Sequence, residues 1–118
     1  MPQDEIDIEV MAHDARNAAL RADLENRGVD LQSPRSIELH FWSPNQRSAA
    51  LLGKSLYDRG FLVLVLGPAV NAEGNRRWNL EVGANLPAER ALDTAFTRDL
   101  VNLANQQSSE YDGWGTSV

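Results

Sequence analysis

Apolar residues follow strand-like spacing in some stretches of this chain and helix-like spacing in others. The order of these stretches limits the fold more than any other feature. Alternating or continuously apolar stretches of strand length occur in four segments: 36–42, 61–66, 76–82 and about 109–112. Apolar residues at helical spacing occupy two segments between them: 44–59 and 87–106. The element order after residue 33 is therefore strand, helix, strand, strand, helix, strand.

This order predicts an α+β fold of the ferredoxin-like split βαβ type, in which a four-stranded antiparallel sheet carries both helices on one face. We expect Trp78 and Phe96 to be core residues that join the third strand to the second long helix. We expect the first long helix to begin with Ser43 as its cap, Pro44 at the first helical position and Gln46 completing a capping box.

An additional helix is predicted over residues 4–27, before this fold begins, and Gly28 ends it. Its narrow stripe consists of Ile6, Val10, His13, Asn17, Leu20 and Leu24. The stripe contains two polar residues, His13 and Asn17. We therefore expect the helix to pack through the stripe on the domain or on a second copy of the chain, with both polar side chains hydrogen-bonded there.

The net charge is −6, and most of it lies near the N-terminus. Residues 1–32 hold eight acidic and three basic residues, a charge of −5, so we divide the chain into this acidic helix with its linker and a ferredoxin-like domain, residues 33–118. An acidic surface disfavours direct binding to nucleic acid and favours a basic protein partner. The chain has no cysteine, no long apolar run and an acidic start, and we expect a cytoplasmic protein.

The chain ends EYDGWGTSV, with two aromatic residues around an Asp-Gly pair. Asp112 and Gly113 predict a tight turn after a short fourth strand, with Tyr111 and Trp114 at its first and fourth positions, where their rings can meet. Two interpretations stay open. The rings either anchor the last strand or belong to a binding site.

The residue types that enzymes use for catalysis form no arrangement typical of an active site in this chain. His13 and His40 lie in different elements, and Glu38 and His40 on one strand face are typical of a surface pair. The chain lacks a glycine-rich phosphate loop, a helical metal-ligand spacing and a nucleophile elbow. We therefore expect a protein without catalytic activity, cofactor or metal.

RNA-recognition modules share the predicted fold, and they stack bases on sheet aromatics within a basic surround. Here Trp78 is expected to face the core, and Arg76 and Arg77 are few against the net charge of −6. Direct binding of single-stranded RNA therefore ranks below protein binding.

Four stretches of the chain are similar to one bacterial family: the strand IELHFW, a helix ending in DRGF, the strand WNLEV after an acidic glycine turn, and the end EYDGWGT. Over roughly residues 36–115 the chain resembles the ribonuclease E inhibitor family, regulator of ribonuclease activity B (RraB-like). The match from Glu110 to Gly115 is the most specific. The resemblance implies a ferredoxin-like domain without catalysis that binds the non-catalytic scaffold region of ribonuclease E and restrains RNA decay.

If the chain is such a regulator, we expect its partner on the exposed face of the sheet. The candidate partner-binding residues come from the first strand, the third strand and the tail: Glu38, His40, Trp42, Asn79, Glu81, Tyr111, Asp112 and Trp114. Tyr111 and Trp114 should lie near the rim of that face. The alternative is an interaction module of other purpose, such as a toxin-neutralising or assembly protein. A homo-oligomer formed through the N-terminal helix is a further expectation.

Overall fold

The computed structural model describes residues 3–117, and it confirms the predicted α+β architecture. The elements within these residues are α1 (Gln3–Asn26), β1 (Pro34–Ser43), α2 (Gln46–Asp58), β2 (Leu62–Val70), β3 (Arg76–Pro87), α3 (Ala88–Leu92), α4 (Thr94–Gln106) and β4 (Glu110–Gly115). Residues 1, 2 and 118, which the predicted segments include, lie outside the described residues.

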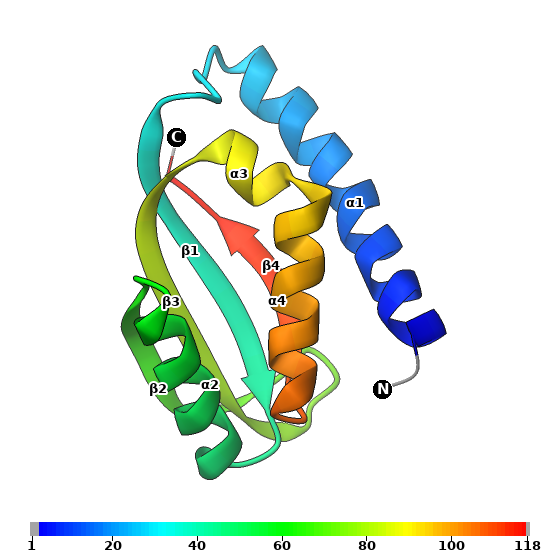
Figure 1. Cartoon of the computed structure of the whole chain (residues 1–118), viewed down its shortest axis with the longest axis vertical. Helices are drawn as coiled ribbons and strands as arrows, with labels where there is room; N and C mark the ends of the chain where they lie inside the picture. The colour runs from blue at the N-terminus through cyan, green and yellow to red at the C-terminus, as the bar shows by residue number, and fades with distance from the viewer. Residues whose placement is uncertain (1–2, 118) are drawn as a thin grey trace.

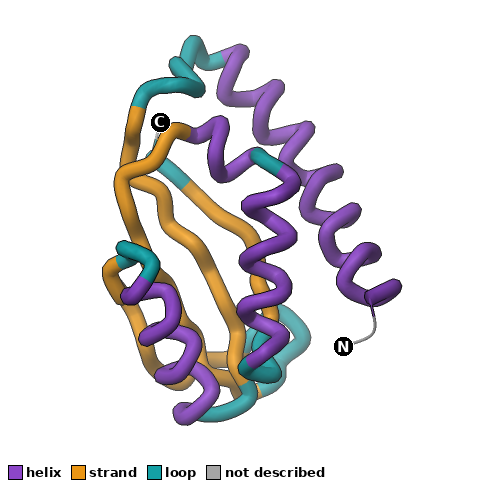
Figure 2. The backbone as a smooth tube through the Cα atoms, in the orientation of Figure 1, coloured by secondary structure: helices purple, strands orange, loops and turns teal. Residues whose placement is uncertain are grey.

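The strands form one antiparallel sheet in the order β2-β3-β1-β4. Figure 1 shows α2 and α4 on the same side of this sheet, with α1 running alongside α4. The backbone trace in Figure 2 shows the two central strands, β1 and β3, as the longest strands of the layer behind the helices. Among residues 3–117, no helix is long and apolar enough to cross a lipid bilayer.

The alternation predicted for the first strand decides which side of the sheet is buried. Ile37, Leu39 and Phe41 have no exposed surface, and the register pairs Leu39 with Val82 and Phe41 with Leu80. Residues directly opposite on antiparallel strands share a face, so these side chains form one apolar layer under the helices. The helices complete the core with Leu52, Leu56, Leu100, Val101, Leu103 and Ala104.

Helix α1 packs through its predicted stripe on its own domain. Ile6 and Val10 belong to the same apolar cluster as the sheet residues. His13 and Asn17 are 5% and 6% exposed, and both are hydrogen-bonded, as expected. The stripe is therefore occupied within the chain itself.

Two ion pairs beside the stripe hold α1 to its neighbours. Arg98 of α4 lies 2.6 Å from Asp7, and Arg21 of α1 makes a bidentate contact with Glu89 of α3 at 2.8 and 2.6 Å. The hydrogen bond from Arg98 lowers the pKa of Asp7. These groups are exposed by a third or more, so solvent screens both pairs and neither adds much to stability.

The predicted single helix over 87–106 is two helices, α3 and α4. Asp93 has an extended backbone (φ −71°, ψ 133°), and its carboxylate accepts a hydrogen bond from the Phe96 amide at 3.1 Å. Asp93 is thus the N-cap of α4, because its side chain satisfies an amide that the helix leaves free. Phe96, predicted to be a core residue, is half-buried and packs against the core cluster from outside it.

The expected cap of α2 is wrong. Asn45, rather than Ser43, caps the helix, and its side chain accepts a hydrogen bond from the Ser48 amide at 2.9 Å. Ser43 is the last residue of β1, and its hydroxyl is 2.6 Å from that of Ser109. Ser43 is buried, so its hydroxyl takes a buried partner instead of the helix end.

Candidate functional site

The sheet has a second face, which none of the helices formed by residues 3–117 covers. We call this surface the open face and define it by the residues Glu38, His40, Trp42, Asn79, Glu81 and Asp112. The first three alternate with the buried residues of β1, and the register sets His40 opposite Glu81 and Trp42 opposite Asn79. The structure therefore brings six of the eight predicted site residues together on one surface.

An acidic cluster with one imidazole lies at the centre of the open face. His40 Nδ1 is 2.8 Å from Glu81 Oε1, and these side chains are 32% and 25% exposed. Glu38 offers a further carboxylate, and one donor atom from each residue lies within 4.8 Å of the others. Asn79 Nδ2 donates to Glu81 Oε2 at 3.4 Å, which helps to turn Oε1 towards His40. Rigid central strands hold all of these groups in place.

Glycines lie beside this cluster on β3 and β4, the two strands that flank β1. The register pairs Glu38 with Gly83 of β3 and Gly115 of β4, and it pairs His40 with Gly113. A Cβ at Gly113 would meet no atom within 4 Å, and one at Gly115 would lie 3.7 Å from His40 Nε2. The β4 side of the cluster is thus a floor without side chains. A hollow of about 270 Å³ opens beside Glu38, over Gly115.

Trp42 and Asp112 form a second group on the open face. The indole Nε1 of Trp42 donates to Asp112 Oδ2 at 3.2 Å. Glu110 lies opposite Trp42 in the register, so it shares this face. An aromatic ring surrounded by carboxylates suits a partner that carries both positive charge and apolar surface.

Tyr111 and Trp114 lie on the other face, so the expectation that they rim the open face is wrong. Tyr111 is 4% exposed, and its ring packs against Phe41 and against His13 of α1, with centroids 5.3 and 4.7 Å apart. Trp114 packs against the core, and its Nε1 donates to Asn17 Oδ1 at 3.0 Å. Both aromatics therefore hold α1 to the sheet.

The backbone of the tail explains this placement. The Asp-Gly pair, predicted as a turn, is a β-bulge inside β4, because the register shifts between Phe41, opposite Tyr111, and His40, opposite Gly113. Gly113 has φ +105°, a conformation that favours glycine. The bulge adds one residue to β4, so Tyr111 and Trp114 face the same side although they are three positions apart.

Sequence reasoning missed an apolar extension of the open face. The register places Leu62 opposite Gly83 and Val65 opposite Glu81, and the Leu64 side chain lies over Gly83. These three residues, which we call the apolar strip, belong to the edge strand β2, and Leu62 is 63%, Leu64 52% and Val65 41% exposed. The continuous apolar run 61–66 carries no mark of exposure, since an edge strand and a buried strand share this composition.

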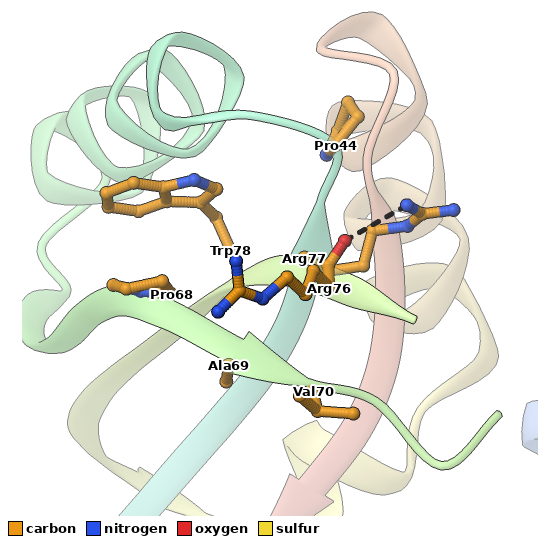
Figure 3. Close-up of a pocket in the computed structure, with 7 residues that line it drawn as sticks. All are labelled: Pro44, Pro68, Ala69, Val70, Arg76, Arg77 and Trp78. Atoms are coloured by element: carbon orange, nitrogen blue, oxygen red, sulfur yellow. Dashed lines mark hydrogen bonds between the residues drawn. The ribbon is translucent and has the colours of Figure 1, made fainter. Parts of the chain in front are cut away.

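A hollow of about 540 Å³ lies at the end of the sheet, where Trp78 meets its register partner Pro68 (Figure 3). Trp78 is half-buried there and is no core residue, contrary to prediction, because the register sets it opposite Ser43, where β1 ends. Arg76 and Arg77 also line the hollow, and neither forms an ion pair within the described residues. This end of the molecule can accept an anionic group.

Comparison with known proteins identifies the family of the chain. No match was found among curated proteins. The family model described as regulator of ribonuclease activity B matches residues 14–116, which adds the second half of α1 to the region in which the resemblance was seen. Because this match covers most of the chain, the chain belongs to the family of regulators of ribonuclease activity B.

Proposed function

We propose that this chain is a non-catalytic regulator that binds ribonuclease E, at an arginine-rich part of its non-catalytic region, through the open face. The family supports a role in the control of a ribonuclease. The observation that carries the proposal is the placement of Glu38, Glu81 and Asp112 on one uncovered sheet face beside Trp42. Carboxylates on rigid strands bind guanidinium groups without losing much side-chain freedom.

The apolar strip gives this surface a second component. Interfaces between proteins commonly combine apolar contacts with a polar rim, and the contacts that dominate affinity are often aromatic. Val65 lies opposite Glu81 of the acidic cluster, and Leu62 and Leu64 lie beside it at Gly83. A segment with alternating basic and apolar side chains would fit both parts of the surface.

Charge reversal at the centre of the open face tests the proposal. The unchanged chain and the Glu38→Lys/Glu81→Lys variant are compared for binding to the non-catalytic region of ribonuclease E from the same organism. We expect the variant to bind at least tenfold more weakly, and we expect binding of the unchanged chain to weaken as salt rises. Thermal melting of both proteins checks that the variant stays folded.

The matched control is Glu5→Lys/Glu25→Lys, which changes the net charge equally at two exposed positions of α1. It should bind nearly as well as the unchanged chain. Equal losses in both double variants would show that only total charge matters. Unaffected binding in both would rule out the open face. Failure of the unchanged chain to bind ribonuclease E would favour an interaction module of other purpose.

The hollow at Trp78 favours a second candidate, the binding of single-stranded RNA. A half-buried indole beside two arginines that form no ion pair within residues 3–117 can stack a base and contact a phosphate. Gel-shift titrations with single-stranded RNA test it, with Arg76→Gln/Arg77→Gln as the variant. A shift that the variant loses supports this candidate, and the absence of any shift at low salt excludes it.

A further inference from the structure

We propose that Glu38, His40 and Glu81 form a binding site for one divalent transition-metal ion. Their nitrogen and oxygen donor atoms are those that zinc prefers. The proposal concerns the chain alone and does not depend on any ribonuclease. It rests on the convergence of three donor atoms from two neighbouring strands, one nitrogen and two carboxylate oxygens, all within 4.8 Å of one another.

The distances fit a shared ion. Zinc bonds imidazole nitrogen and carboxylate oxygen at about 2.0–2.2 Å, so two ligands of a tetrahedral zinc ion lie about 3.4 Å apart. His40 Nδ1 and Glu81 Oε1 are 2.8 Å apart, a hydrogen-bond distance, so these two atoms must separate by about 0.6 Å to share the ion. Glu38 completes three ligands by a change of side-chain rotamer, because it is exposed and forms no ion pair within the described residues.

The backbone fixes the ligand positions before any ion binds. Glu38 and His40 are two positions apart on the central strand β1, so both side chains leave the same face. Glu81 stands directly opposite His40 on the neighbouring strand β3. Asn79 contacts the second oxygen of Glu81 and supplies the outer contact that orients metal-binding carboxylates in other proteins.

The glycines supply room for the ion and for water. Three protein ligands leave a fourth position of a tetrahedral ion open to solvent. The floor formed by Gly113 and Gly115 carries no side chain over that position, and the hollow beside Glu38 adjoins it. With an ion on Nδ1, the neutral ring would carry its proton on Nε2, which faces the space over Gly115.

Calorimetric titration of the full chain with zinc chloride, after removal of metals with a chelator, tests the proposal. We expect saturable binding of one ion per chain. Glu38→Gln, His40→Gln and Glu81→Gln should each weaken it about tenfold or more, while Glu25→Gln on α1 should leave it unchanged. Magnesium chloride should give no comparable binding, because imidazole is a poor ligand for magnesium.

Thermal melting provides a second measurement on the same proteins. Zinc should raise the melting temperature of the unchanged chain and of Glu25→Gln, and that of Glu38→Gln clearly less at the same zinc concentration. Glu38 is exposed, so this variant should fold normally. The proposal is overturned if zinc does not saturate the chain, if all three ligand variants bind as tightly as the unchanged chain, or if magnesium binds equally well.

Discussion

Trp42 and Trp114 carry the same side chain on opposite faces of one sheet. Each is half-buried, and each indole N–H donates to a side chain, Trp42 to Asp112 at 3.2 Å and Trp114 to Asn17 at 3.0 Å. Trp114 packs against the core beneath α1, whereas Trp42 lies on the face that no helix among the described residues covers. The comparison distinguishes the contacts that hold the domain together, around Trp114, from the surface proposed to bind a partner, around Trp42.

Strand β4 serves both faces at once. Its aromatic residues, Tyr111 and Trp114, point towards the helices, and its glycines, Gly113 and Gly115, lie opposite the acidic cluster of the open face. The EYDGWG segment therefore anchors α1 through its aromatic residues on one face of the sheet. On the open face its glycines leave the space beside the acidic cluster free of side chains. The following predictions start on the anchor side, where the expected effects on stability are largest.

Truncation of Tyr111 should have the largest effect. Tyr111→Ala removes a buried ring that contacts Phe41 and His13, and it should lower the free energy of unfolding by about 3–5 kcal/mol. Tyr111→Phe is the control. The Tyr111 hydroxyl is buried without a hydrogen-bond partner among the described residues, so its removal should leave stability equal or higher. Urea unfolding measures both, and a large loss in Tyr111→Phe would contradict this account.

Asn17 should come second. Its amide oxygen accepts from the Trp114 N–H, and its amide nitrogen donates to the Thr97 hydroxyl at 3.5 Å. Asn17→Ala leaves the Trp114 N–H without this partner, whereas Thr97 keeps its hydrogen bond to the Asp93 carbonyl. We expect a loss of about 1–3 kcal/mol. Ala18→Ser, at the exposed neighbouring position of α1, should change stability by less than about 0.5 kcal/mol. Similar unfolding midpoints for both variants would show that α1 is held by other contacts.

His13 should make the anchor sensitive to pH. Burial lowers the pKa of His13, and the Arg16 charge lowers it further, against the opposite effects of the Tyr111 carbonyl, Asp112 and Asp14. Arg16 donates to Nδ1 at 2.8 Å, so the neutral ring is the form that fits. A folded pKa below 6.5 means that stability is complete above about pH 6.5 and is lost as the pH falls below it.

Thermal melting across this pH range checks the sign. The melting temperature of the unchanged chain should fall more steeply with acidification than that of His13→Gln, which cannot gain the proton. Parallel curves would mean that His13 is not the group responsible.

Neutralising the open face should affect stability least. Glu38→Gln changes an exposed carboxylate, and Glu81→Gln changes one that contacts His40. Each should alter the free energy of unfolding by less than about 1 kcal/mol, the usual limit for partly exposed pairs. Urea unfolding of both variants measures this, and a loss as large as that of Asn17→Ala would make the cluster part of the framework.

Sequence patterns predicted the first strand from the alternation of Ile37, Leu39 and Phe41, which are buried in the structure. The same alternation also predicted which side chains of β1 face outward. Sequence patterns could not predict the facing of Trp114, because an Asp-Gly pair satisfies a turn and a bulge equally well. Only the pairing with β1 shows that β4 contains a bulge. The contact between His40 and Glu81 likewise depends on the register of two strands about forty residues apart, which no local pattern contains.

Partner binding by the two tryptophan variants tests the central claim most directly. Trp42→Ala and Trp114→Ala are titrated against the non-catalytic region of ribonuclease E, at a temperature where circular dichroism shows both variants folded. We expect Trp42→Ala to bind at least tenfold more weakly with a nearly unchanged melting temperature, as for an aromatic contact at an interface. We expect Trp114→Ala to melt at a lower temperature but to bind normally. Loss of binding in folded Trp114→Ala, with normal binding in Trp42→Ala, would contradict the account.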